Sequence, residues 1–521
     1  MMPWTRPLRS WQQRALLVTR VTGPDCLIMA TPAAGKTTLA LRVAHEQLER
    51  SQIERVVIVC PTDHLRAQWT TAAAAVGIQL DPDLHGGRCV EARDYIGAVV
   101  TYHQVARKPA AFAVGPGRRR TLVVLDEVHH AADGREWGDG LREAFGLASY
   151  RLALSGTPFR SDDTPIPFVR YNAAGISEAD FTYGYRDAIR DQVCRPMFFP
   201  SYEGDVQWMD NKGHHRARFF DQLNEVQSRR RLKTALLRGT WLAPVLRDAT
   251  TRLHTLRSGD HAQAGGLVIA MDQDHARAMQ TLMKQVLGLT VPLAISDDAE
   301  SSRIIQRFTA SWEPWLIAVK MVSEGVDIPR LRVGIYATNI STEMYFRQVV
   351  GRFVRLRPEL GRPQQAWLYL PKDPTLIAYA QAIEAERNHV LDDAEASEPV
   401  VEPHGLGRQA SSFVPISATA KADELFGVQE QTEATVRETD WAQPGSERTA
   451  TMTRSLAEHK EQLRAQHQTL VGECARRTGT GFREINLELI KRVGGRIEVA
   501  TVAQLTRRIR LLTSWRDRGM V

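Results

Sequence analysis

The sequence predicts an α/β protein made of two parallel-sheet lobes in tandem, followed by a helical C-terminal region. Short apolar runs alternate with helical stretches, which is typical of doubly wound parallel sheets. These runs fall into two groups, and a glycine-containing loop follows the first run. The predicted strands of the first lobe are 27–30, 56–60, 98–101, 122–125 and 152–155, and those of the second are 267–270, 316–320, 333–337 and 367–370.

The loop after the first predicted strand is the strongest functional signal. Residues 30–38 read ATPAAGKTT and precede a helical stretch, 39–47. A strand, a small-residue loop ending in Gly-Lys-Thr and a helix together form the context of a phosphate-binding loop (P-loop). Backbone N–H groups and the positive end of the helix then hold ATP phosphates, and the lysine reaches the β- and γ-phosphates. The residues concerned are Ala34, Gly35, Lys36, Thr37 and Thr38, and the Thr37 hydroxyl would bind Mg²⁺. Because Ala30 replaces the first glycine of the pattern, an ordinary strand-to-helix turn is the alternative.

A pair of carboxylates further along the chain fits this loop as a partner. The β-branched run 121–125 ends in Asp126 and Glu127, and parallel sheets place their ligands at such strand ends. We expect Asp126 to hold Mg²⁺ and Glu127 to orient or deprotonate the attacking water. For one carboxylate by itself, an acidic cap at a strand end is the alternative.

Two more segments follow in an order that chance does not readily produce. Residues 155–160 read SGTPFR after another predicted strand, and residues 348–355 read QVVGRFVR. Arg352 and Arg355 are three residues apart, so we expect them on one face of a helix. Two guanidinium groups placed in this way can converge on a γ-phosphate as arginine fingers.

With these segments, the chain resembles the superfamily 2 helicases and translocases over roughly residues 5–375. Lys36 and Thr37 match motif I, 126–129 (DEVH) motif II, 155–158 motif III and 348–355 motif VI. The resemblance implies two RecA-like lobes that bind ATP between them, with the P-loop in the first lobe and the arginines in the second.

The resemblance also implies roles for individual residues. Gln12 matches the glutamine that reads the adenine edge, and Asp327 of motif V belongs to the nucleotide site. Gln348, Arg352 and Arg355 would act with Glu127 in hydrolysis. The positions implied to grip nucleic acid, or to couple it to hydrolysis, are Pro61, Thr62, Thr101, Tyr102, Ser155, Thr157 and Gly325.

The residues within these motifs indicate which branch of superfamily 2 the chain resembles. SGTPFR, EGVDIP at 324–329 and the tyrosine-rich 181–185 look like the XPB-like and restriction-motor helicases, which mostly act on duplex DNA. The DEAD and SAT motifs of DEAD-box RNA helicases do not occur in the sequence, and Gln348 stands where that branch has histidine. Ala33 occupies a position that is glycine in most relatives, and its Cβ narrows the loop slightly.

Composition is consistent with a nucleic-acid partner. The chain of 521 residues is 43% hydrophobic and 24% charged, which is ordinary for soluble globular proteins. Its net charge of +7 suits a polyanion, although an excess of arginine over lysine can also reflect a GC-rich genome. Five dispersed cysteines indicate a reducing compartment, and no apolar run is long enough to cross a bilayer. We therefore expect a cytoplasmic protein that does not bind membranes.

The expected domains are a first lobe (1–175), a connecting segment (176–258), a second lobe (259–391), a linker (392–450) and a helical C-terminal module (451–521). In the connecting segment we expect helix over 216–238, and the arginines 229–231 lie either on a solvated face or on nucleic acid. In the C-terminal module, a capping-box pattern at 501–504 begins a helix with Leu505, Ile509 and Leu512 on one face. The preceding helix is predicted at 484–493. This module is either a packing unit or a surface that binds DNA or a protein partner.

Taken together, the sequence predicts ATP-driven movement along nucleic acid, with ATP and Mg²⁺ as cofactors and DNA favoured over RNA. Three alternatives stay open: an RNA helicase, an ATP-gated clamp that does not unwind, and the motor subunit of a restriction or defence system.

Overall fold

The structure, a computed structural model, describes most of the chain in two units. The described residues are 3–84, 91–114, 119–132, 135–156, 165–173, 175–210, 213–218, 221, 223, 225–237, 241–259, 261–295, 299–319, 328–361, 364–391, 413–418, 421–422 and 455–518. Unit 1 comprises Met1–Met29, Gly35–Thr182 and Arg437–Val521, and unit 2 comprises Ala30–Ala34 and Tyr183–Val436.

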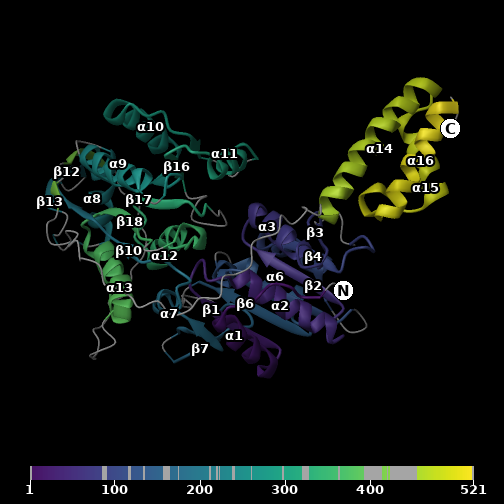
Figure 1. Ribbon diagram of the computed structural model, residues 1–521, viewed down its shortest axis with the longest axis horizontal. Helices are drawn as coiled ribbons and strands as arrows, with labels where there is room; N and C mark the ends of the chain where they lie inside the picture. Colours follow the sequence, from purple (N-terminus) through teal and green to yellow (C-terminus); the bar gives the residue numbers. More distant parts are fainter. Residues whose placement is uncertain are drawn as a thin grey trace. The chain divides into compact units, whose positions relative to one another are not determined.

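A seven-stranded sheet forms the centre of the first lobe (Figure 1). The first six strands in the sheet order pair in parallel, as the alternation of apolar runs and helices predicts. In sheet order the strands are β3 (Leu80–Asp81), β4 (Gly97–Thr101), β2 (Arg55–Cys60), β5 (Thr121–Leu125), β6 (Tyr150–Ser155), β1 (Asp25–Ala30) and β9 (Phe181–Tyr183). All five strands predicted for this lobe are confirmed to within two residues at either end.

Helices connect these strands, and two of them begin with a threonine cap. Thr62 accepts a hydrogen bond from Leu65 N at the start of α3, and Thr101 accepts one from Gln104 N at the start of α4. The helical elements of the lobe are α1 (Ser10–Val21), α2 (Lys36–Glu49), α3 (Asp63–Ala74), α4 (Tyr102–Arg107), α5 (Pro109–Phe112), η1 (Val128–Ala132) and α6 (Arg135–Phe145), and a two-stranded ribbon adds β7 (Arg170–Tyr171) and β8 (Ser177–Glu178).

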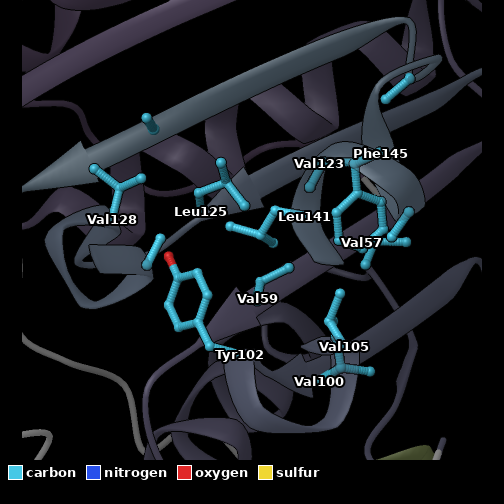
Figure 2. Close-up of a cluster of buried hydrophobic side chains, with 14 of the residues drawn as sticks. Val57, Val59, Val100, Tyr102, Val105, Val123, Leu125, Val128, Leu141 and Phe145 are labelled. Carbon is cyan, nitrogen blue, oxygen red and sulfur yellow. The ribbon is translucent and has the colours of Figure 1, made fainter. Parts of the chain in front are cut away.

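Figure 2 shows the core between this sheet and its helices. Valines and leucines of β2, β4 and β5 pack against Leu141 and Phe145 of α6, and these side chains are almost fully buried. Their burial holds the C-terminal ends of the strands in register. The loops that follow β1, β2, β4 and β5 therefore emerge from a rigid edge, which is where parallel sheets carry their ligand sites.

Unit 2 is built on a second, mostly parallel sheet. Its order is β15 (Leu293–Ala294), β16 (Trp315–Val319), β14 (Gly265–Ala270), β17 (Leu331–Ala337), β18 (Ala366–Pro371), β11 (Ser201–Glu203) and β20 (Lys421–Ala422), and β10 (Met197–Phe198) also pairs with β18. The helices are α7 (Tyr185–Arg190), α8 (Glu225–Leu237), α9 (Leu242–Ser258), α10 (Gln273–Leu287), α11 (Ala299–Ala310), α12 (Glu343–Phe353), η3 (Pro358–Leu360) and α13 (Pro374–Leu391). The four predicted strands of this lobe are confirmed, so both lobes have the expected RecA-like architecture.

Two segments of unit 2 contain strands that the sequence did not predict. The predicted linker 392–450 contains β19 (Phe413–Ala418), which pairs with β12 (Asp205–Asp210), and β20, which pairs with β11. The predicted helix over 216–238 begins only at Glu225, because 213–218 is β13, the hairpin partner of β12. Within α8, the Arg231 side chain is buried and forms an ion pair with the buried Asp373 at 2.6 Å, so it lies neither on a solvated face nor on nucleic acid.

The C-terminal module is a set of three helices that groups with unit 1. It comprises α14 (Leu456–Thr478), α15 (Phe482–Val493), the short η5 (Ile497–Val499) and α16 (Val502–Arg518). The capping box is confirmed, because Gln504 N donates to Thr501 Oγ1 and Thr501 N donates to Gln504 Oε1. As expected, Leu505 and Leu512 are buried. None of the described helices is long and apolar enough to span a bilayer.

Candidate active site

The P-loop has a backbone conformation that depends on glycine. Gly35 precedes α2 with φ 100°, in the left-handed region, and a Cβ there would lie 2.9 Å from Gln12 Nε2. Ala33 is also left-handed, with φ 66°, where an L side chain is strained. Lys36 is the first residue of α2, so the open N–H groups of that helix face the loop. The loop can therefore hold an anion.

Gln12 of α1 is built into this loop. Its Nε2 donates to Gly35 O at 2.9 Å, its Oε1 accepts from Arg9 N at 2.8 Å, and its side chain is buried. Both ends of the amide therefore contact protein, and Gln12 braces the glycine that opens the helix. The predicted contact with adenine stays a prediction.

Lys36 meets the second carboxylate of the DEVH segment. Its Nζ lies 3.1 Å from Glu127 Oε1, and Glu127 Oε2 accepts from Gly156 N at 3.1 Å. Burial opposes the charged form of Glu127, but the Lys36 ammonium and His129 outweigh it and lower the pKa of Glu127. Glu127 is thus an ionised group that keeps partial exposure, as a residue that orients water must be.

Asp126 is held more deeply, by two aromatic residues. Trp69 Nε1 of α3 donates to Asp126 Oδ2 at 2.7 Å, and the Tyr102 hydroxyl of α4 donates to Asp126 O at 2.9 Å. Burial, and then the neighbouring Glu127, raise the pKa of Asp126. Glu127 pairs with the Lys36 ammonium, and Asp126 adds a second carboxylate next to it in the chain. Asp126 carries a carboxylate and Thr37 a hydroxyl, and both are oxygen donors that Mg²⁺ prefers, so these residue types fit this cation.

The strand that follows the DEVH segment is joined to it. Ser155 is fully buried, and its Oγ lies 3.3 Å from His129 Nδ1. The same histidine ring lies 3.7 Å from Glu127 Oε2. This chain of contacts links Ser155 to the water-orienting carboxylate. Thr157, the other coupling residue predicted here, lies outside the described residues.

The residues predicted to grip nucleic acid in the first lobe differ in their exposure. Pro61 is half-buried, and Thr62 and Thr101 cap α3 and α4. The Tyr102 side chain is buried and its hydroxyl donates to Asp126 O, so this side chain is joined to the DEVH segment, and the role of the Tyr102 position in binding or coupling nucleic acid stays a prediction. Sequence reasoning missed Trp69. The sequence signal for it is an aromatic residue seven positions after Thr62, about two helical turns further along the same helix face.

In unit 2, the structure separates the two arginines that we expected on one helix face. Gln348 and Arg352 lie on α12, but the helix ends at Phe353, so Arg355 lies beyond it. Arg195 N donates to Val354 O at 2.7 Å, and Arg355 forms a bridge with Cys194, so the chain leaves the helix to pair with an extended segment. The expectation of a shared helix face was therefore wrong. Gly325 and Asp327 lie outside the described residues.

Comparison with known proteins agrees with this picture. Residues 6–160 match the family model "Type III restriction enzyme, res subunit". The chain is 40% identical to the "uncharacterized protein MT2985" of Mycobacterium tuberculosis (strain CDC 1551 / Oshkosh), over 96% of this chain and 92% of that protein. It is 22% identical to the "DNA 3'-5' translocase XPB2" of Sulfurisphaera tokodaii, over 67% of this chain and 78% of that one.

A solved structure shares the fold. It is a fragment of a putative HsdR subunit of a type I restriction enzyme from Vibrio vulnificus YJ016, with a TM-score of 0.51 and 18% identity over 73% of this chain and 66% of that one. The chain therefore belongs to the family of the mycobacterial protein MT2985, and its two lobes are of the superfamily 2 helicase class.

Proposed function

We propose that this protein is an ATP-dependent motor that moves along DNA. The observation that carries the proposal is the pairing of Lys36 with Glu127 beside the buried Asp126, at the end of a left-handed glycine loop. An ammonium, two carboxylates and an open helix N-terminus at one sheet edge suit phosphoryl transfer from a nucleoside triphosphate to water.

Each residue then has a defined role. The N–H groups at 34–38 and Lys36 hold the phosphates, while Thr37 and Asp126 would hold Mg²⁺. The bound cation supplies charge neutralisation at the β- and γ-phosphates. Glu127 orients the attacking water and accepts its proton, because its carboxylate is ionised. Gln348, Arg352, Arg355 and Asp327 are proposed to contribute from the second lobe, and Gln12 to contact the base.

Contacts within the first lobe suggest how hydrolysis acts on nucleic acid. The helices α3 and α4 start at Thr62 and Thr101, which we propose to bind the phosphate backbone together with Pro61. The same two helices supply Trp69 and Tyr102, which bind the Asp126 side chain and main chain. A shift of either helix would therefore change a hydrogen bond to Asp126. We propose that Ser155, Thr157 and Gly325 contribute to the same coupling.

The test is the ATPase rate of the full chain without nucleic acid and with single-stranded DNA, duplex DNA or RNA of equal length. Stimulation by nucleic acid is expected. Lys36→Ala and Glu127→Gln should abolish turnover without a change in melting temperature. Glu127→Gln should still bind ATP, because it removes only the ionised carboxylate. Turnover near the wild-type rate in either variant would contradict the assignment, and strand displacement on a tailed duplex would separate a helicase from a clamp.

The restriction-enzyme family match favours a second candidate, a motor subunit that serves a nuclease on another chain. Co-purification of a nuclease subunit with the full-length protein, in stoichiometric amount, would support it. A protein that displaces strands by itself, with no such partner, would argue against it.

A further inference from the structure

The C-terminal module carries most of the net charge of the protein. Residues 455–518 contain 13 lysines and arginines against 7 acidic residues, a net charge of +6, whereas the whole chain has +7. The proposed ATP site uses none of these side chains. The excess therefore needs another explanation.

Some of these cations serve the structure. Lys460 is buried, with its Nζ 2.5 Å from Asp94 Oδ1 and 4.3 Å from the centre of the Tyr95 ring. Asp94 also accepts from Val502 N at 3.1 Å, and so fixes the start of α16 to the first lobe. Arg508 is buried as well and donates to Gly494 O. Arg464 adds an ion pair with Asp83.

Other cations lie on the outward face of α16. We call Arg507, Arg510 and Arg518 the arginine stripe. They are separated by three and eight residues, which places them on one side of a helix, opposite the buried Leu505 and Leu512. At 1.5 Å of rise per residue, the stripe is about 16 Å long.

The arginine stripe is available to bind a partner. All three side chains are exposed, and within the described part of the chain none has a hydrogen bond or an ion pair. The one acid on α16, Asp517, is paired with Arg516. The small Ala503 and Ser514 share the outward face, so a partner can approach the helix closely. Figure 1 shows α16 beside α14, with its start at the end of the module where α14 begins.

We propose that the arginine stripe binds the phosphate backbone of nucleic acid and gives the motor a contact outside its two lobes. Three unpaired cations at this spacing repel one another, and a polyanion relieves that repulsion. Guanidinium groups bind phosphates through paired hydrogen bonds without reading sequence. The inference shares its polyanion with the proposed function but rests on different residues. The exposed apolar side chains of the module, Phe482, Leu487 and Ile490, lie on α15 and are absent from the stripe.

The experiment measures binding without ATP, so that its outcome is independent of the ATPase assignment. Full-length protein carrying Arg507→Gln, Arg510→Gln and Arg518→Gln is titrated against fluorescent duplex DNA, single-stranded DNA and RNA of equal length at several salt concentrations. The control variant, Lys284→Gln, Arg303→Gln and Arg307→Gln, removes the same charge from exposed positions of α10 and α11. Replacement of the stripe by three lysines should preserve most of the affinity.

The stripe variant is expected to bind at least about tenfold more weakly than the control variant, and its log Kd against log salt should be less steep by about 3. The melting temperature and the ATPase rate without nucleic acid should not change. A loss confined to one of the three nucleic acids would support the proposal and identify the ligand. Equal affinity and slope for the stripe and control variants on all three would overturn it and leave α15 as the surface for a protein partner.

Discussion

At the residue scale, the candidate site depends on positions where a single Cβ or a single hydrogen bond sets the local geometry. Gly35 has no room for a Cβ beside Gln12 Nε2, whereas Ala33 carries a Cβ in a left-handed conformation that favours glycine. Asp126 has a partner at its side chain, Trp69, and another at its carbonyl oxygen, Tyr102. These contacts make the phosphate-binding edge sensitive to small changes.

The two small residues of the P-loop should respond in opposite ways. Gly35→Ala adds a Cβ at φ 100° and 2.9 Å from Gln12 Nε2, so ATP binding should fall by at least about tenfold. Ala33→Gly relieves a left-handed alanine, a strain of about 1 kcal/mol, and should leave binding unchanged or tighter. Titration with a fluorescent ATP analogue measures both variants. Equal effects of the two changes would show that the loop adopts another conformation when it binds nucleotide.

Trp69→Phe should weaken catalysis more than folding. The change keeps the aromatic packing but leaves a buried oxygen of Asp126 without its N–H donor, at a cost of about 1–3 kcal/mol. Because Asp126 is proposed to hold Mg²⁺, the Mg²⁺ concentration for half-maximal ATPase should rise several-fold. Trp312→Phe, at an exposed tryptophan, is the control. An unchanged Mg²⁺ dependence with a lowered melting temperature would reduce Trp69 to a packing role.

At the element scale, helix ends place the chemistry. The helices α2, α3 and α4 all begin at the edge where β1, β2 and β4 end, and α12 stops before Arg355 can share its face. A helix face can be predicted from spacing, but the last residue of a helix depends on what the chain meets next. In α12 the competing partner is the segment at Cys194 and Arg195, which is distant in sequence.

Arg352→Ala and Arg355→Ala should each reduce ATP turnover by about 10³-fold, the range of arginine fingers. The Cys194–Arg355 bridge is made by the main chain, so Arg355→Ala removes the guanidinium and keeps the bridge. Arg347→Ala on the same helix is the control, because Arg347 pairs with Glu343 and Glu386. Single-turnover hydrolysis is the measurement. Losses within a few-fold of the control would assign the two arginines to structure.

At the scale of the whole molecule, the chain forms two units of the superfamily 2 class, and unit 1 includes a basic module that Asp94 anchors to the first lobe. Backbone contacts carry no sequence information, so nucleic-acid binding should be tolerant of sequence and steeply dependent on salt. The net charge favours any polyanion. The predicted preference for DNA rests on the residues of the SGTPFR and EGVDIP motifs.

DNA is therefore expected to stimulate ATP hydrolysis more than RNA of equal length at moderate salt. The comparison requires several sequences of each, at saturating ATP, with Lys36→Ala as the background. Stronger stimulation by RNA across these sequences would move the protein to the RNA-helicase alternative, and the proposed ATP-site residues would be unaffected.

The sequence by itself determined the strands of both lobes, the P-loop, the paired carboxylates and the capped helix α16. These features are set by local periodicity, by turn chemistry and by short spacings, which act within a few residues of the chain. Tertiary structure alone decided that Trp69 holds Asp126, that Gln12 braces Gly35, and that β19 joins β12 from within a predicted linker. These contacts join residues that are 23 or more positions apart, and folding selects them through burial and hydrogen-bond satisfaction, which leave no local pattern in the sequence.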